Sequence, residues 1–329
     1  MVKNLIEVRN LKKYFPVQKG FVETLLAKKI DYIKAVDDIS FNIRKGEVFG
    51  LAGESGSGKT TTGRLILRLT EPTEGKVFFN NTDISLLSSN EMRGFRKRMQ
   101  IIFQDPYASL NPRMKIGDSI GHSLLIHKIC NEDEKRKKVL SIMVKVELTP
   151  NNVLYGKYPH QLSGGQRQRA VIARALILQP ELIVADEPIA MTDVSVRATL
   201  LKLMMDLKNE FDLTYLFITH DLATTKYICN RIAIMYLGKI FEMGKIYDVY
   251  SNPKHPYTTA LLSAVPVPDP KARRKHLIPR GEIPSPINPP TGCRFHPRCP
   301  KAMDICSKKE PELIDTGNNH LVACHLKYH

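Results

Sequence analysis

Hydrophobic residues in the first 262 positions fall into short apolar runs separated by helix-like stretches. Val48–Ala52, Leu182–Ala185 and Thr214–Thr219 are apolar runs of strand length. Lys59–Leu69 is helix-like, and Val194–Phe211 repeats apolar residues at helical spacing. Strands that alternate with helices predict an α/β fold with a mainly parallel core sheet and crossover helices.

Two regions depart from this alternation. Leu5–Val8 and Ala35–Ile43 resemble an antiparallel β edge. Residues 116–147 hold two helical stretches, of which the second is strongly charged over Asn131–Lys138. We therefore expect a helical insert at about residues 105–180, joined to the α/β core.

The chain changes character after residue 262. Eight prolines lie from Pro266 to Pro290, a density that excludes regular helix and central strand and predicts an extended connection. Four of the six cysteines follow it, whereas the first 292 residues hold only two. We therefore expect two domains, residues 1–262 and a proline-rich, cysteine-rich extension of residues 263–329 that forms its own small unit.

Composition narrows the class of protein. The chain has 329 residues, of which 43% are hydrophobic and 25% charged, which excludes disordered and fibrous proteins. No apolar stretch is long enough to span a membrane, and the first twenty residues lack a signal-peptide pattern, so we expect a soluble, cytosolic protein. The net charge of +16 suits a polyanionic partner, but it is spread out, and only Lys271, Arg273, Arg274 and Lys275 cluster tightly. A solvated basic surface is the favoured explanation of this charge.

A phosphate-binding motif lies between the first core strand and its helix. Gly53–Thr60 reads GESGSGKT and satisfies G-x-x-x-x-G-K-[ST]. Glycines let backbone N–H groups converge on phosphate oxygens, and the helix start adds partial positive charge. Lys59 would neutralise β- and γ-phosphate oxygens, and the Thr60 hydroxyl would ligate Mg²⁺. The predicted nucleotide-binding residues are Gly53, Ser55, Gly56, Ser57, Gly58, Lys59, Thr60 and Thr61.

Two carboxylates end the strand that begins at Leu182. Parallel sheets place ligands at the carboxyl ends of their strands. Asp186 would hold the water shell of Mg²⁺, and Glu187 could polarise the attacking water as a general base. Taken alone this pattern is weak, but together with Gly53–Thr60 it indicates a nucleotide hydrolase.

Leu162–Gln166 reads LSGGQ and opens a helix-like run to Leu178, with Ser163 as a good N-cap. Its glycines expose backbone N–H groups at a second helix start, so it could bind phosphate or be an ordinary glycine turn. One nucleotide cannot occupy both surfaces of a single chain unless the chain folds back. Two subunits paired head to tail, each covering the other's nucleotide, are the simpler arrangement.

These elements together carry a family resemblance. Gly53–Thr60, Gln104, Leu162–Gln166, Asp186–Glu187 and His220 have the order and spacing of an ATP-binding-cassette (ABC) ATPase, whose own signature is LSGGQ. The resemblance implies the ABC fold, with ATP and Mg²⁺ as cofactors and Thr60 and Gln104 at the metal. It implies that Gln104 signals to a permease and that His220 contacts the γ-phosphate, beside Glu187 in catalysis.

The resemblance also implies residues at the two ends of the nucleotide. Ser163 and Gly165, with Gln166 beside them, match positions that face the γ-phosphate of a partner subunit. Phe15 is our choice for the aromatic that stacks on adenine, with Tyr14 as the alternative. One departure concerns the loop after Glu187, where the family usually reads Thr-Ser-Ala-Leu-Asp and this chain has Ile189–Asp193, with Ala190 at the serine position. That change puts turnover rate in question.

Three segments narrow the resemblance to the ATPases of dipeptide and oligopeptide importers. They are Phe103–Arg113, His255–Pro266 and Pro284–Cys293, and the residues between Phe15 and Asp31 look more like the F-type subunit. The implied assembly holds a second ABC ATPase, two permease subunits and, indirectly, an extracytoplasmic solute-binding protein, at the cytoplasmic face of the cell membrane and without nucleic acid. The implied function is ATP hydrolysis that drives peptide import. A regulatory subunit with weak hydrolysis and a soluble ABC ATPase acting on nucleic acid are the alternatives, and nickel or oligosaccharides are other possible solutes.

The cysteine-rich tail predicts a metal centre. Cys293, Cys299, Cys306 and Cys324 could close a [4Fe–4S] cluster or a tetrahedral zinc site. The spacing lacks the tight C-x₂-C pairs of zinc ribbons, which favours iron, and resemblance to the importer extensions favours it further. Four free thiols are the alternative.

Overall fold

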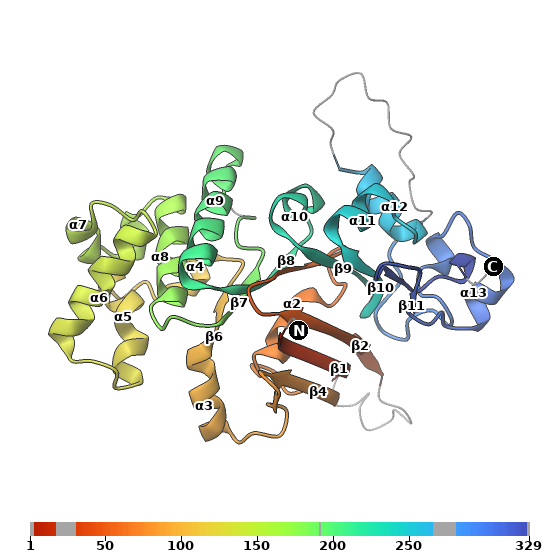
Figure 1. Ribbon diagram of the computed structural model, residues 1–329, viewed down its shortest axis with the longest axis horizontal. Coiled ribbons are helices and arrows are strands. Elements are labelled where there is room, and N and C mark those ends of the chain that lie inside the picture. Colours follow the sequence, from red (N-terminus) through yellow and green to blue (C-terminus); the bar gives the residue numbers. More distant parts are fainter. Residues whose placement is uncertain (1–2, 18–30, 191, 266–280, 328–329) are drawn as a thin grey trace, which may run out of the picture. The chain divides into compact units, whose positions relative to one another are not determined.

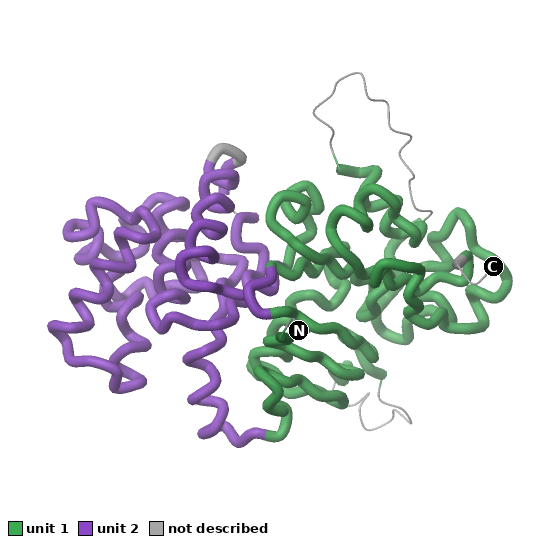
Figure 2. The backbone as a smooth tube through the Cα atoms, viewed as in Figure 1, with its two compact units in different colours: residues 1–44, 48–86, 218–329 green, residues 45–47, 87–217 purple. Residues whose placement is uncertain are grey.

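The computed structural model describes residues 3–17, 31–190, 192–265 and 281–327. The chain divides into two compact units, Met1–Arg44 with Val48–Leu86 and Ile218–His329, and Lys45–Glu47 with Leu87–Phe217 (Figure 2). The basic cluster at 271–275, most of the insertion after Phe15, and part of the proline-rich stretch lie outside the described residues. We describe each unit by itself.

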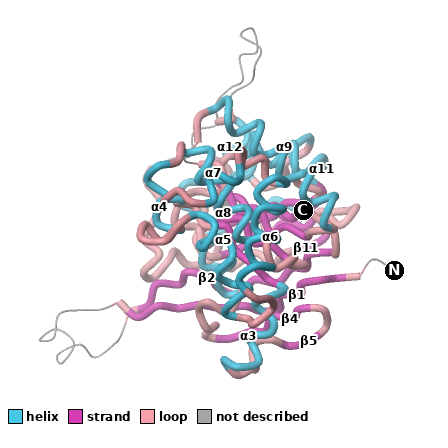
Figure 3. Tube along the Cα trace, turned by 90° about the vertical axis from the view of Figure 1, so that its left-hand side faces the viewer, coloured by secondary structure: helices cyan, strands magenta, loops and turns pink. Residues whose placement is uncertain are grey.

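The first unit contains an antiparallel sheet with the strand order β2-β1-β4-β5 (Figures 1 and 3). Its strands are β1 (Asn4–Pro16), β2 (Tyr32–Arg44), β4 (Glu74–Phe79) and β5 (Thr82–Asp83). Ile6 and Val8 alternate into the core, and register shifts after Val8 bring Leu11 to the buried side as well. The predicted antiparallel edge is therefore confirmed, with strands longer than the pattern alone indicated.

A second sheet region of this unit runs in the order β11-β12-β10-β9-β3. Its strands are β3 (Val48–Ala52), β9 (Arg231–Tyr236), β10 (Lys239–Lys245), β11 (Ile314–Asp315) and β12 (Leu321–Val322). β3 is buried throughout and pairs in parallel with β9, whereas the β9–β10, β10–β12 and β11–β12 pairs are antiparallel. The cysteine-rich tail thus adds β11 and β12 to a sheet of the cassette.

Short helices complete the first unit. They are α2 (Lys59–Ile66), α10 (Leu222–Ile228), α11 (Ile246–Ser251), α12 (Pro256–Ser263), α13 (Asp304–Lys308) and the 3₁₀ turns η2 (His296–Arg298) and η3 (His325–Lys327). One buried cluster unites residues of β9, β10 and α12 with Cys293, Phe295 and Cys306 of the tail. The tail therefore shares a hydrophobic core with the cassette. The division at residue 262 remains a prediction.

The second unit joins a small parallel sheet region to a group of helices. β8 (Thr214–Thr219), β7 (Leu182–Asp186) and β6 (Met99–Ile102) follow one another, with β6 and β7 parallel. Its helices are α3 (Ser89–Arg98), α4 (Pro106–Ser109), α5 (Ile116–Ile126), α6 (Glu132–Lys145), α7 (Asn151–Tyr155), η1 (Pro159–Gln161), α8 (Gly164–Leu176) and α9 (Val194–Phe211). The helices α4 to α8 lie in the stretch of about 105–180 in which the sequence predicted a helical insert, whereas α3 and α9 lie outside it. Among the described residues, no helix is long and apolar enough to cross a lipid bilayer.

Candidate functional site

The segment Gly53–Thr60, which we call the phosphate loop, links β3 to α2 in the first unit. At two of its glycines, close neighbours leave no room for a side chain. A Cβ atom on Gly53 would lie 2.1 Å from the Met235 carbonyl oxygen. Gly58 has φ +104°, and a Cβ there would lie 2.1 Å from the Ala35 carbonyl oxygen. Gly58 also begins α2 without a side-chain cap, so backbone N–H groups alone form the helix start. Such a start is suited to binding phosphate.

Lys59 is held inside this turn, with 5% of its surface exposed. Its ammonium donates hydrogen bonds to the carbonyl oxygens of Gly53 at 2.8 Å and Glu54 at 2.9 Å, and to the Ser57 hydroxyl at 3.4 Å. A buried ammonium within a turn of backbone N–H groups fits the charge and size of a phosphate group. The residues predicted from Gly53 to Thr61 therefore lie together in one cradle.

Residues far along the chain support the loop. The Glu54 N–H donates to the Tyr257 hydroxyl at 3.0 Å, and the Gly238 N–H donates to the Ser57 carbonyl at 2.9 Å. Arg298 forms a forked ion pair with the Glu54 carboxylate. Tyr257 is fully buried, and burial raises the pKa of its hydroxyl. The sequence analysis did not predict these contacts. One signal was present, because a carboxylate inside a phosphate loop needs a nearby cation to neutralise its charge.

The two candidate adenine-stacking residues lie on β1 in different surroundings. The Tyr14 hydroxyl donates a short hydrogen bond to Asp37, and burial together with this bond raises the pKa of Tyr14. Asp37 in turn pairs with Arg294 of the tail. Phe15 is 37% exposed, with the Lys13 ammonium 5.0 Å from its ring centroid. The ring of Phe15 is therefore accessible, whereas the Tyr14 hydroxyl is engaged in a hydrogen bond with Asp37.

In the second unit, Gln104 and Glu187 lie together although 83 positions separate them. The Gln104 side-chain amide donates to the Glu187 carboxylate at 2.8 Å. Asp186, the last residue of β7, is 4% exposed, and Glu187 has φ +47°, a strained value for a residue with a side chain. The strained turn follows the buried strand directly, so the two carboxylates have distinct environments.

The signature segment, Leu162–Gln166, begins α8 and is capped by its own residues. The Ser163 hydroxyl accepts from the Gln166 N–H at 3.3 Å, and the Gln166 side chain accepts from the Ser163 N–H at 3.0 Å. This reciprocal capping box begins α8, as the sequence predicted for Ser163. A Cβ on Gly164 would meet no atom within 4 Å, and Gly165 follows it in the first turn.

The loop after Glu187 is tied down by Arg197 of α9. The Arg197 guanidinium donates to the carbonyl oxygens of Thr192 at 3.0 Å and Ala190 at 3.5 Å, and the Thr192 hydroxyl donates to the Ile189 carbonyl at 2.8 Å. Met191 lies outside the described residues. The loop therefore has an internal hydrogen-bond network that includes the backbone carbonyl of Ala190.

His220 belongs to the first unit and directly follows β8. Its side chain is exposed, and the next residue, Asp221, caps α10 by accepting from the Ala223 N–H at 2.9 Å. The predicted site residues thus fall into two groups. The phosphate loop, Phe15 and His220 belong to the first unit, and Gln104, Asp186, Glu187 and the signature segment belong to the second.

The four tail cysteines are free thiols, and three of them are buried, at 7–8% exposure. Burial and, to a smaller extent, the neighbouring Cys324, Cys306 and Cys299 raise the pKa of Cys293 to about 12. The four thiols are thus close enough to interact electrostatically and supply the soft ligands that iron and zinc prefer. The described residues nevertheless contain no group of three or more Cys, His, Asp or Glu arranged to hold a metal ion. The metal centre therefore stays a prediction.

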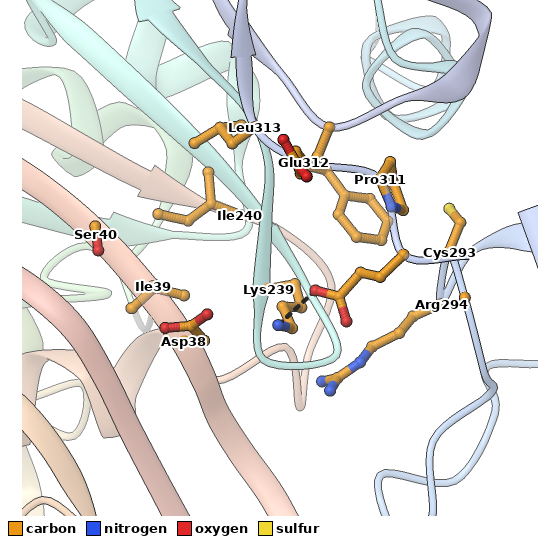
Figure 4. Close-up of a pocket in the computed structure, with 14 residues that line it drawn as sticks. Asp38, Ile39, Ser40, Lys239, Ile240, Cys293, Arg294, Pro311, Glu312 and Leu313 are labelled. Carbon is orange, nitrogen blue, oxygen red and sulfur yellow. Dashed lines mark ion pairs between the residues drawn. The ribbon is translucent and has the colours of Figure 1, made fainter.

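A cavity of about 510 Å³ lies where the tail meets β2 and β10 (Figure 4). Its wall includes Asp38 of β2, Lys239 of β10 and Arg294 and Glu310 of the tail. The Lys239 ammonium and the Glu310 carboxylate form an ion pair of 2.6 Å across this junction. This ion pair therefore joins the tail to the cassette.

Comparison with known proteins identifies two regions of the chain. Residues 36–190 match the family model described as ABC transporter, and residues 241–306 match the one described as Oligopeptide/dipeptide transporter, C-terminal region. The second match spans β10, α12 and the tail through Cys306.

Curated relatives match over nearly the full length. The chain is 47% identical over 327 residues to the oligopeptide transport ATP-binding protein AppF of Bacillus subtilis (strain 168), covering 98% of each chain. It is 47% identical over 320 residues to the dipeptide transport ATP-binding protein DppF of Haemophilus influenzae (strain ATCC 51907 / DSM 11121 / KW20 / Rd), covering 97% of this chain and 96% of the relative. Among solved structures, the ATP-binding cassette MJ0796 bound to ADP and phosphate matches with a TM-score of 0.64 at 29% identity, covering 73% of this chain and 98% of that one.

Proposed function

The chain belongs to the ABC transporter ATP-binding proteins of the oligopeptide and dipeptide transport family, and we propose that it is the ATP-hydrolysing subunit that powers import of such peptides. One observation supports the proposal: the loop Gly53–Thr61 holds a buried lysine at a helix start, in a chain that matches a peptide-transport ATP-binding protein over 98% of its length. As an ABC ATPase, the protein uses ATP with Mg²⁺.

In the first unit, ATP binds by its phosphates and its base. Lys59 and the loop N–H groups contact the β- and γ-phosphates, and the Thr60 hydroxyl is a ligand of Mg²⁺. Phe15 stacks on adenine, because its ring face is accessible while the Tyr14 hydroxyl is engaged with Asp37. His220, exposed at the end of β8, contacts the γ-phosphate.

In the second unit, Glu187 takes a proton from the attacking water as the general base. Gln104 orients the Glu187 carboxylate through its 2.8 Å hydrogen bond and adds an oxygen ligand for Mg²⁺. Asp186, buried at the end of β7, holds the metal's water shell. When bound, Mg²⁺ would neutralise the charge that develops on the phosphate oxygens.

The signature segment acts on the nucleotide of a partner. Ser163, Gly165 and Gln166 present the start of α8 to the γ-phosphate held by a second ABC ATPase subunit. Two permease subunits anchor the pair at the cytoplasmic face of the cell membrane, and an extracytoplasmic solute-binding protein delivers the peptide to them. Isolated chains should therefore hydrolyse ATP poorly.

A regulatory role with weak hydrolysis is the second candidate. It is favoured by the loop Ile189–Asp193, whose sequence departs from the one usual in the family. Arg197 holds this loop by hydrogen bonds to the carbonyl oxygens of Ala190 and Thr192. Replacing Ala190→Ser and Thr192→Leu together in the assembled transporter should raise turnover if the loop limits it. Unchanged turnover would remove the reason for this second candidate.

The test of the main proposal is ATP hydrolysis by the chain assembled with its partners. Glu187→Gln should retain ATP binding and lose nearly all turnover, because the amide cannot take a proton. Asp206→Asn, a substitution of the same kind on α9, is the matched control and should hydrolyse ATP at the parental rate. Parental turnover in the Glu187→Gln complex would show that the base is assigned wrongly. A wild-type chain that binds no ATP would refute the function itself.

We also propose that Cys293, Cys299, Cys306 and Cys324 hold a [4Fe–4S] cluster, with Zn²⁺ as the alternative. The proposal is supported by four soft ligands in one tail and by the electrostatic interaction among their thiols. Anaerobic purification followed by iron, sulfide and zinc analysis tests it. Zinc without iron would replace the cluster with the alternative, and four freely titratable thiols without metal would refute both.

A further inference from the structure

Arg298 of the cysteine-rich tail reaches the phosphate loop and pairs with Glu54. Its two terminal nitrogens lie 2.9 and 3.3 Å from the two Glu54 carboxylate oxygens, a forked geometry that fixes direction as well as distance. The Arg298 side chain is 9% exposed and that of Glu54 is 24% exposed. Salt therefore screens this pair less than it screens pairs on the open surface.

The position of Glu54 gives this pair its significance. Glu54 is the second residue of the phosphate loop, and its own carbonyl oxygen accepts a hydrogen bond from the Lys59 ammonium. A carboxylate in a loop that binds phosphate opposes the ligand's charge unless a cation neutralises it. Arg298 supplies that cation from outside the loop motif.

The Arg298 side chain leaves one of its own hydrogen-bond donors unsatisfied. Its Nε is buried and has no hydrogen-bond partner in the described part of the chain, and such an atom destabilises the fold. Burial alone would lower the pKa of Arg298, but its contacts with Glu54 and Tyr236 raise it instead. The guanidinium is thus a permanent charge held in place by Glu54 and Tyr236.

We infer that Arg298 is a positioning residue of the nucleotide site, which neutralises and orients Glu54 so that the loop can accept the phosphates of ATP. This inference rests on the proposed function and extends it, because it makes the tail part of the ATP-binding apparatus. Tyr257 holds the Glu54 backbone from α12 at the same time as Arg298 holds its side chain. The tail and α12 thus act on one loop residue.

The test compares four full-length proteins: the parent, Arg298→Gln, Glu54→Gln and the double variant. Mg·ATP affinity is measured by titration with a fluorescent ATP analogue and competition by ATP. Arg298→Gln should weaken ATP binding about tenfold, because it leaves the Glu54 carboxylate uncompensated beside the phosphates. Glu54→Gln should change binding about twofold, and adding it to Arg298→Gln should restore most of the loss.

Two further measurements separate positioning from folding. Adenosine, which has no phosphate, should compete equally well in all four proteins. In the assembled transporter, Arg298→Gln should raise KM for ATP and leave kcat nearly unchanged. Glu310→Gln, which breaks the ion pair between the tail and Lys239, is the matched control and should keep parental ATP affinity.

The inference fails if Arg298→Gln binds ATP as the parent does, or if the double variant binds no better than Arg298→Gln. It also fails if adenosine binding falls as far as ATP binding, since the effect would then be structural. If Arg298→Gln does not fold, Arg298→Lys takes its place. It keeps the charge but loses the fork, so ATP binding should weaken about threefold, and parental affinity would refute the inference. A parent that does not bind ATP would instead refute the proposed function.

Discussion

The two glycine-rich helix starts of this protein are built in different ways. The phosphate loop before α2 has no side-chain cap and is held by Tyr257, Gly238 and Arg298, all of them distant in sequence. The signature segment before α8 is held by its own capping box of Ser163 and Gln166. The shape of the phosphate loop therefore depends on distant residues of its unit, whereas the signature segment is held by hydrogen bonds within four residues.

This difference predicts how far the effect of a mutation extends. A turn held by distant residues can be perturbed from many places, and its shape reports on the packing of its whole unit. A turn held by a local cap is perturbed mainly by changes to the cap. The following predictions test that contrast.

The largest effect is expected from Lys59→Ala. Loss of a buried ammonium should weaken binding of Mg·ATP by roughly a hundredfold or more in the isolated chain. Gln166→Ala, in the signature segment, should leave that affinity unchanged, because we assign this segment to a partner's nucleotide. Isothermal titration calorimetry measures both. Equal losses of affinity would contradict the division of roles between the two turns.

A pair of glycine substitutions comes next. Gly58→Ala should destabilise the chain by about 3 kcal/mol or more, because its Cβ would lie 2.1 Å from a backbone oxygen at φ +104°. Gly164→Ala meets no atom within 4 Å and should shift the free energy of unfolding by less than about 1 kcal/mol. Urea denaturation followed by circular dichroism gives both values. A tolerated Gly58→Ala would show that the loop can move away from Ala35.

Acid should weaken the support of the phosphate loop. Burial lowers the pKa of His255, at the start of α12, to about 4, with Glu242 opposing the shift in part. Below pH 6.5 the unfolded chain takes up a proton that the native chain excludes until about pH 4. Stability should therefore fall by up to about 3 kcal/mol over that interval. In His255→Gln the fall should be smaller, and an equally steep fall would assign it to other groups.

The smallest effect concerns the local cap. Ser163→Ala should cost about 1 kcal/mol of unfolding free energy, as the loss of an N-cap hydroxyl typically does. Ser88→Ala is the matched control, since Ser88 forms the same capping box with Glu91 at the start of α3. The two losses should agree within about 0.5 kcal/mol. A much larger loss at Ser163 would mean that this turn also depends on distant contacts.

Much of the fold could be predicted because its signals are local. The strand at Thr214–Thr219 and the helix at Val194–Phe211 have the bounds that the apolar pattern indicated. The helix at Lys59 ends at Ile66, three residues before the predicted Leu69. The cap at Ser163 was also visible, because its partner lies three residues away.

What could not be predicted depends on contacts between distant segments. Nothing in the tail's composition shows that Leu321–Val322 pairs with β10, since two residues are too few for a strand pattern. The ion pair between Glu54 and Arg298 joins residues 244 positions apart, and neither lies in a recognisable pattern with the other. The role of Glu187 in catalysis, argued from its place after a buried strand, and the roles of Gln104 and His220, implied by resemblance, stay predictions.

The separation between Glu54 and Arg298 along the sequence has a consequence for the synthesis of the protein. A ribosome makes the phosphate loop early and reaches Arg298 only 244 residues later, which takes roughly 12 to 50 seconds at common rates of synthesis. During that interval the loop exists without its countercharge. The nascent chain therefore acquires the ion pair between Arg298 and Glu54 only when translation is almost over, so a product truncated before Arg298 would lack it.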